Sequence, residues 1–148
     1  MMIKVKIKLL EGGKMPTKGT AGAAAFDCYA REDVSVGGNP KLIGLGFALE
    51  IPEGYHAKIF PRSSIGLKTS LRQPNCCGII DSDYRGEVKA MYEKKIVCDC
   101  YDNQITEIKA GERIAQMLIE RNEDVELVAT DELSETERGT GGFGSTGK

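Results

Sequence analysis

The chain is organised around the stretch Gly78-Ile79-Ile80-Asp81-Ser82-Asp83-Tyr84-Arg85-Gly86. Two apolar residues run into two carboxylates and then into an aromatic ring, a guanidinium and a glycine, which predicts a buried strand that ends in a turn. A carboxylate at such a boundary is held by the core and still reaches water, so Asp81 is the candidate general base. The alternative is a solvated turn in which Asp83 pairs with Arg85 and Asp81 only accepts hydrogen bonds from backbone amides.

Short alternating segments on both sides of this stretch predict an all-β fold. Apolar residues alternate with lysines over residues 3–9, and the alternation returns over residues 45–51 before a turn at 52–54. Period two is typical of a strand with one buried face. No helical periodicity is sustained over three turns, so the chain reads as a single domain of short strands, a β-barrel or jelly-roll-like fold. The other expected strands are residues 55–60, 88–92, 95–101, 104–108, 113–119 and 125–129.

The C-terminal segment has a different composition. Five of residues 139–148 are glycine, so we expect a β domain over residues 1–137 and a flexible, Gly-rich C-terminal arm over residues 138–148. The arm carries cations, hydroxyls, free N–H groups and one aromatic ring, Phe143. Such a segment is suited to closing over an anionic ligand with a flat ring. The alternative is a disordered terminus without a function.

Length and charge limit the functional classes. With 148 residues the chain is long enough for one core but not for two ordinary domains. Twenty basic residues against 22 acidic ones give a net charge of -2, which predicts no nucleic-acid partner. Residues 1–10 contain three lysines and no continuous apolar run. We therefore expect neither a signal peptide nor membrane association, and a cytoplasmic protein.

Cysteine and histidine usage argues against a protein-bound metal. Five cysteines without a secretion signal indicate reduced thiols. Cys76-Cys77 and Cys98-x-Cys100 could supply four thiolates to zinc, but neither pair has the usual two-residue spacing, and small core residues are the other interpretation. The single histidine, His56, argues against a histidine metal site or a Ser-His-Asp triad and is expected to be an ordinary strand residue.

Three further positions carry polar groups in apolar surroundings. Asp27 follows a run of alanines, and is either a buried carboxylate paired with an arginine or with backbone N–H groups, or lies near a metal-bound substrate. Residues 61–68, Pro-Arg-Ser-Ser-Ile-Gly-Leu-Lys, follow a strand and offer donors for phosphate oxygens. They also predict a helix start with Ser63 or Ser64 as N-cap, which is compatible with that role. Arg113 and Gln116 lie within an apolar strand and require partners.

Taken together, these segments closely resemble the homotrimeric deoxyuridine triphosphate nucleotidohydrolases, the dUTPases. Five motifs occur in the family's order, at residues 25–27, 61–64, 75–86, 113–116 and 138–147. The resemblance implies Mg²⁺-dependent hydrolysis of dUTP to dUMP and pyrophosphate by water attack at the α-phosphorus. This reaction limits uracil incorporation into DNA and supplies dUMP for thymidylate synthesis. It also implies a homotrimer with shared active sites, in which the tail of one subunit closes over a site formed by two others.

The resemblance assigns roles to individual residues. Asp81 matches the aspartate that activates the attacking water, and Tyr84 matches the aromatic that packs on deoxyribose and excludes a 2′-hydroxyl. Asp27 matches an aspartate near Mg²⁺ that acts through water, because the ion is held mainly by the triphosphate. The other implied substrate-binding residues are Asn75 and the backbone of Gly78, Ile79 and Ile80 for uracil, Arg62, Ser63, Ser64, Gln116, Arg138, Ser145 and Thr146 for phosphates, Phe143 as the ring stacked on uracil, and Lys89 and Gly144.

The sequence departs from the family at two places and leaves two other functions open. Ser64 stands where the family often has glycine, and the segment 87–110 is several residues longer than usual. One alternative function is a related dCTP deaminase, which would release ammonia from dCTP. The other is a non-catalytic module that keeps the pocket to sense dUTP, and it would bind the nucleotide without turnover.

Overall fold

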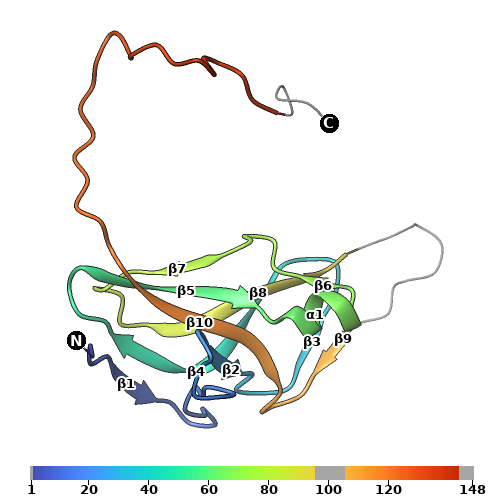
Figure 1. Ribbon diagram of the computed structural model, residues 1–148. Helices are drawn as coiled ribbons and strands as arrows, with labels where there is room; N and C mark the ends of the chain where they lie inside the picture. Colours follow the sequence, from blue (N-terminus) through green and yellow to red (C-terminus); the bar gives the residue numbers. More distant parts are fainter. Residues whose placement is uncertain (1, 96–105, 144–148) are drawn as a thin grey trace, which may run out of the picture.

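The structure, a computed structural model, describes residues 2–95 and 106–143. This part of the chain consists of short strands and one short helix (Figure 1), which confirms the all-β prediction. The elements are β1 Lys6–Leu9, β2 Phe26–Tyr29, β3 Val34–Val36, β4 Lys41–Glu50, β5 Tyr55–Pro61, α1 Ser63–Lys68, β6 Leu71–Arg72, β7 Gly78–Ile80, β8 Glu87–Lys94, β9 Thr106–Ile108 and β10 Arg113–Arg121.

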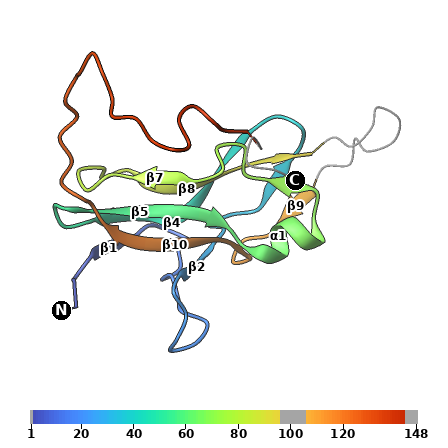
Figure 2. The ribbon, with the colours of Figure 1, turned by 45° about the horizontal axis from the view of Figure 1, so that its top comes forward.

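The strands form two four-stranded antiparallel sheets and a small ribbon. The first sheet has the order β1-β4-β8-β6, the second has the order β2-β10-β5-β7, and β3 pairs with β9. The ribbon lies at the end of the molecule that carries α1 (Figures 1 and 2). Buried side chains from both sheets form a single core. Within the described residues neither sheet closes on itself, so the fold is the jelly-roll-like arrangement of open sheets rather than a closed barrel.

The core follows from the alternation in β4 and β8. Ile43, Leu45 and Phe47 are fully buried on β4, and each large apolar side chain removed from water stabilises the fold by about 1.5–3 kcal/mol. Tyr92 on β8 is also fully buried, and its hydroxyl donates a hydrogen bond to the carbonyl of Ile114 at 2.6 Å. This bond ties the first sheet to the central strand of the second.

A bulge in β4 depends on glycine. The pairing of β4 with β8 shifts register between Gly44 and Ala48. Gly46 in this bulge has φ +75, and a Cβ there would collide with the backbone of Gly13. The freed N–H of Gly46 donates to Oε1 of Glu87 at 3.1 Å, which fixes the first side chain of β8. The bulge therefore places a carboxylate at the start of the strand.

Two predicted local features are wrong. The helix α1 begins at Ser63 with Arg62 as its N-cap and without a side-chain cap hydrogen bond, so neither Ser63 nor Ser64 is the N-cap. Residues 125–129 do not form a strand, and Val125, Leu127 and Val128 are exposed. Their alternation is typical of a strand, but in the described residues no neighbouring strand offers them hydrogen-bond partners, and an unpaired strand is not stable in water.

The segment after β10 leaves the sheets. Residues 122–143 contain no helix or strand and form an arc away from the body of the molecule (Figures 1 and 2). The proposed boundary at residue 137 stays a prediction. The strand expected at 104–108 is confirmed where it is described, as β9, whereas the one expected at 95–101 lies, apart from Lys95, outside the described residues. In the described part of the chain no helix is long and apolar enough to cross a membrane.

Candidate active site

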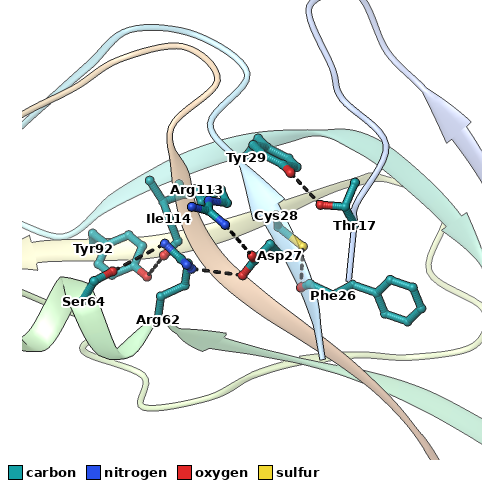
Figure 3. A network of polar contacts seen from close by, with 10 residues as sticks. All are labelled: Thr17, Phe26, Asp27, Cys28, Tyr29, Arg62, Ser64, Tyr92, Arg113 and Ile114. Carbon is teal, nitrogen blue, oxygen red and sulfur yellow. Dashed lines mark hydrogen bonds and ion pairs between the residues drawn. The ribbon is translucent and has the colours of Figure 1, made fainter. Parts of the chain in front are cut away.

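Asp27 lies at the centre of a polar cluster between three strands. It is in register with Gln116 on β10, and Gln116 is in turn opposite Phe60 on β5. The Oδ1 atom of Asp27 accepts a hydrogen bond from Nε of Arg62 at 3.0 Å, and Oδ2 accepts one from Nη1 of Arg113 at 3.2 Å (Figure 3). Asp27 is only 7% exposed. Of the two interpretations of Asp27, the structure therefore shows the buried carboxylate paired with arginine, and it pairs with two.

These groups form what we call the arginine cluster, namely Asp27, Arg62, Ser64, Arg113 and Gln116. One carboxylate faces two guanidinium groups, so a net positive charge remains. The guanidinium of Arg62 also reaches Oγ of Ser64, at 3.5 Å, and half of the Arg113 side chain is exposed. Guanidinium and hydroxyl donors in this arrangement are suited to binding phosphate oxygens. Ser63 lies beside the cluster, on the first turn of α1.

Asp81 lines a separate pocket of about 290 Å³. The preceding residue, Ile80, pairs with Ala57 on β5, so the strand holds the start of the turn in place. The carbonyl of Asp81 accepts a hydrogen bond from the N–H of Tyr84 at 3.2 Å, which closes the turn. The pocket is lined by Leu42, Ile79, Ile80, Asp81, Tyr84, Glu87 and Lys89. Five predicted site residues are thus brought together there.

The ring of Tyr84 is fixed by the turn that it closes. Its hydroxyl donates to the carbonyl of Glu87 at 3.1 Å. The ring lies over Gly86, so a Cβ at that position would displace the ring. Arg85 donates to the carbonyls of Ser82 and Tyr84, and no Asp83–Arg85 ion pair occurs among the described residues. The alternative interpretation, in which these two side chains pair, is therefore wrong in that respect.

Two residues of the pocket were missed by the sequence analysis. Glu87 is held by the N–H of Gly46 and by Arg31, whose Nη1 lies 3.3 Å from the Glu87 carboxylate. Leu42 contributes an exposed apolar side chain from β4. Leu42 joins the site only through the pairing of β4 with β8, whereas Glu87 directly follows the turn and its side chain is placed by contacts with the distant Gly46 and Arg31. No local sequence signal identifies them.

The turn before β7 is anchored to β5. The buried Gln73 donates from Nε2 to the carbonyl of Ile59 at 2.9 Å, and the carbonyl of Gln73 accepts from the N–H of Cys76 at 3.0 Å. Gly78 pairs with Ile59, and a Cβ at Gly78 would lie 3.9 Å from Nδ2 of Asn75. The turn therefore holds the Asn75 side chain beside the backbone of Gly78.

The pocket and the arginine cluster lie at opposite ends of β5. Ile80 is opposite Ala57, and Arg62 follows five residues later along the chain. At about 3.3 Å per residue this separates Arg62 from the level of Ile80 by about 17 Å, and Asp81 continues in the other direction. One chain therefore does not bring the candidate base and the candidate phosphate ligands into a single site.

The candidate residues of the arm lie apart from both groups. Arg138 donates from Nε to the carbonyl of Gly141 at 2.8 Å, within the arc, and the Phe143 side chain is fully exposed. Gly144, Ser145 and Thr146 lie outside the described residues.

The described cysteines and the histidine do not form a metal centre. No group of three or more histidine, cysteine, aspartate or glutamate side chains in residues 2–95 and 106–143 is placed to hold an ion. Cys28 is buried, and burial together with the charge of Asp27 raises its pKa to about 12. His56 is a residue of β5 and contacts Asn122, with 2.6 Å between Nδ1 and Oδ1. Cys98 and Cys100 lie outside the described residues.

Comparison with known proteins identifies the family. The dUTPase family model matches residues 11–147. The chain belongs to the dUTPase family. The predicted family is thus confirmed. A deoxyuridine 5′-triphosphate nucleotidohydrolase of Nautilia profundicola is 45% identical over 149 residues, with 100% of both chains covered. One of Yarrowia lipolytica is 41% identical and covers 99% of this chain and 90% of its own.

Solved dUTPase structures share the fold. A mutant dUTPase of Staphylococcus bacteriophage 80alpha, solved with dUpNHpp, is 28% identical with a TM-score of 0.87, covering 99% of this chain and 100% of that one. A mutant dUTPase from phage phi11 of S. aureus is 24% identical with a TM-score of 0.76, covering 88% of this chain and 98% of that one. The latter structure describes a structural Mg(II) ion in that protein.

Proposed function

We propose that this dUTPase-family chain hydrolyses dUTP to dUMP and pyrophosphate. The relative from Nautilia profundicola, which matches the full length of the chain, is named a deoxyuridine 5′-triphosphate nucleotidohydrolase. The motifs of the family lie in the pocket around Asp81 and in the arginine cluster. The observation that carries the proposal is the pocket in which Asp81 and Tyr84 meet the end of β7. The reaction limits uracil incorporation into DNA and supplies dUMP, and a cytoplasmic location is part of the proposal.

Asp81 is proposed to act as the general base. It lies between the pocket and a second, open hollow lined by Glu53, Ser82, Asp83 and Arg85, through which water reaches it. A carboxylate fixed at the end of a strand is able to take a proton from a water that attacks the α-phosphorus. The arginine cluster and the hydroxyls of Ser63 and Ser64 are proposed to bind the phosphates.

Selection of base and sugar is assigned to the β7 hairpin. Asn75 and the backbone of residues 78–80 are proposed to pair with the uracil edge. A cytosine would leave such fixed donors and acceptors unpaired, which costs more than a missing methylene in an apolar pocket. Tyr84, fixed by its bond to the carbonyl of Glu87, is proposed to exclude a ribose 2′-hydroxyl, with Lys89 touching the substrate through its backbone.

The metal requirement is proposed to be met by Mg²⁺ carried on the triphosphate. Both carboxylate oxygens of Asp27 already accept hydrogen bonds from arginines, which suits contact with hydrated Mg²⁺ through water rather than direct coordination. Mg²⁺ keeps several waters and is commonly bound through substrate phosphates. The ion, when bound, offsets charge on the phosphates and stabilises the leaving pyrophosphate.

A complete site is proposed to need more than one subunit. The separation of about 17 Å along β5 places Asp81 and Arg62 in different sites of the same chain. The segment 122–143 rises from the end of β10 away from the sheets (Figure 1). We therefore propose a homotrimer in which the pocket of one subunit faces the arginine cluster of a second. The arm of a third subunit would supply Arg138, Phe143, Gly144, Ser145 and Thr146.

The deciding experiment is pyrophosphate release from dUTP, dCTP, dTTP and UTP in parallel, with Mg²⁺ and with excess chelator. Turnover of dUTP alone, lost with chelator, supports the reaction and its selectivity together. Ammonia release from dCTP would instead indicate a deaminase. A rise in Tm with dUTP but no turnover would indicate a non-catalytic binding module.

A further inference from the structure

Two adjacent thiols form a strained turn directly before β7. Cys76 is exposed and has φ +57, in the left-handed region that few residues other than glycine adopt. The N–H of Cys77 donates to the carbonyl of Asn75 at 2.5 Å, which spans only two residues. A bond from residue i+2 to residue i around positive φ is the rare, strained form of the γ-turn. The strained turn lies between Asn75 and Gly78, two of the candidate base-reading residues.

The second thiol has a cation nearby. The Sγ atom of Cys77 lies 3.6 Å from the carbonyl of Gly78, at the start of β7. Lys58 on β5 is hydrogen-bonded to Glu120 at 2.6 Å, which is the main reason that its pKa is raised, and the charge of Cys77 raises it further. The Lys58 ammonium therefore lies within electrostatic range of the Cys77 sulfur. The thiolate is the reactive form of cysteine.

We propose that Cys76 and Cys77 are a reversible oxidation site that controls nucleotide binding, and that hydrogen peroxide converts the pair to a vicinal disulfide. The Cys77 thiolate attacks the peroxide, the O–O bond breaks, and the leaving oxygen departs as water after protonation, which gives a sulfenic acid. The Cys76 thiol then attacks that sulfur, the S–O bond breaks, and a second water leaves. Two thiols are oxidised and one peroxide is reduced.

Closing this disulfide has to change the turn. Adjacent Cα atoms are about 3.8 Å apart, whereas disulfides usually join Cα atoms about 4.4–6.8 Å apart. The trans peptide bond fixes this separation, so the Cys76–Cys77 disulfide is strained and closes only through changes in the side-chain and backbone torsions of both residues, which shift the turn that holds Asn75 beside Gly78. This consequence for binding rests on the proposed function, in which Asn75 and the backbone of Gly78 contact uracil. A strained disulfide is also readily reduced, so the change is reversible.

The test uses the full, reduced chain titrated with hydrogen peroxide. We expect the mass to fall by two hydrogens, mapped to the peptide that contains residues 76–77. In parallel, the KM for dUTP and the Kd for a non-hydrolysable dUTP analogue rise by about tenfold or more, and a dithiol reductant restores both. Cys76→Ser and Cys77→Ser keep the reduced activity and lose the response. If Cys76→Ser does not fold, Cys76→Gly, which suits positive φ, replaces it.

A matched control separates this pair from the other thiols. The variant with Cys98→Ser and Cys100→Ser retains the full response, and the buried Cys28 is not oxidised. Oxidation elsewhere in the chain, or a mapped 76–77 disulfide with unchanged KM and Kd, would overturn the inference. If the reduced chain neither binds nor hydrolyses dUTP, the proposed function fails by itself. In that case, hydrogen exchange at residues 75–80 tests the inference about the turn. If oxidation leaves the protection of these amides unchanged, the proposed change in the turn is overturned.

Discussion

The Nε atom of Arg62 lies 3.0 Å from Oδ1 of Asp27, and this contact joins segments 35 residues apart in the sequence. The second carboxylate oxygen binds Arg113 from a third segment (Figure 3). One buried carboxylate thus holds together the ends of three strands. It also orients the two cations that we propose to meet the phosphates.

Asp27→Asn is expected to destabilise the protein by about 2–3 kcal/mol, because two guanidinium groups then face each other without a counter-charge. The loss is smaller than the 3–5 kcal/mol typical of a fully buried pair, since both arginines are partly exposed. Urea unfolding at fixed protein concentration measures it. Asp33→Asn, which breaks an exposed pair with Lys109, is the matched control and should change little. Equal effects of the two variants would contradict a special role for Asp27.

Asp81→Asn is expected to lower turnover of dUTP by about 10²–10⁴-fold while nucleotide affinity is retained, because the amide keeps the shape of the side chain but accepts no proton. Pyrophosphate release measures the rate, and the Tm shift with a non-hydrolysable dUTP analogue measures binding. Asp83→Asn, in the same turn, serves as the control. Retained activity in Asp81→Asn would remove the base assignment.

Tyr84→Ala is expected to admit UTP, because the ring that packs against the sugar is lost. Tyr84→Phe keeps the ring and removes only the hydrogen bond to the carbonyl of Glu87, so most of the selectivity should remain. The measurement is the ratio of kcat/KM for dUTP to that for UTP. An unchanged ratio in Tyr84→Ala would exclude this residue from sugar selection.

Deletion of residues 138–148 is expected to reduce catalysis by at least about 10²-fold, because the proposed phosphate and base contacts of the arm are lost. Folding should be unaffected, since the described residues 138–143 contribute no side chain to the core. Pyrophosphate release and Tm are compared for the deletion and for Phe143→Ala. A deletion product that fails to fold would show that the arm is structural.

Stability is expected to fall in alkali through Cys28. Its pKa is raised from 9.0 to about 12 in the folded state by burial and by the charge of Asp27. Below pH 9 the thiol is protonated in both states and stability is complete. As pH rises further, the unfolded chain loses the proton first, so the free energy of unfolding decreases. The free energy of unfolding, measured with urea at several pH values in this range, should fall less steeply with pH in Cys28→Ala than in the unchanged protein. An equal pH dependence of the two would contradict the assignment.

The sequence predicted only those parts of the site that neighbouring residues determine. The strand-to-turn pattern at residues 78–86 correctly placed Asp81 and Tyr84 on one turn, because a strand and the turn after it are fixed by neighbouring residues. The prediction that this strand is buried was wrong, because β7 lies at the edge of its sheet and Ile79 is 56% exposed. The requirement of Arg113 for a partner was also visible from its apolar surroundings. The identity of that partner was not, because Asp27 lies 86 residues away and meets it only through the pairing of β2 with β10.

The sequence by itself determined the all-β class and the family, because period-two alternation and ordered motifs are properties of consecutive residues. Only the tertiary structure decided which segments became strands, since residues 125–129 alternate like a strand but find no neighbour to pair with in the described chain. It also decided that Glu87 is fixed by the Gly46 bulge, and that Asp81 and Arg62 lie at opposite ends of β5. Sheet pairing sets these relations, and pairing depends on residues far apart in the chain.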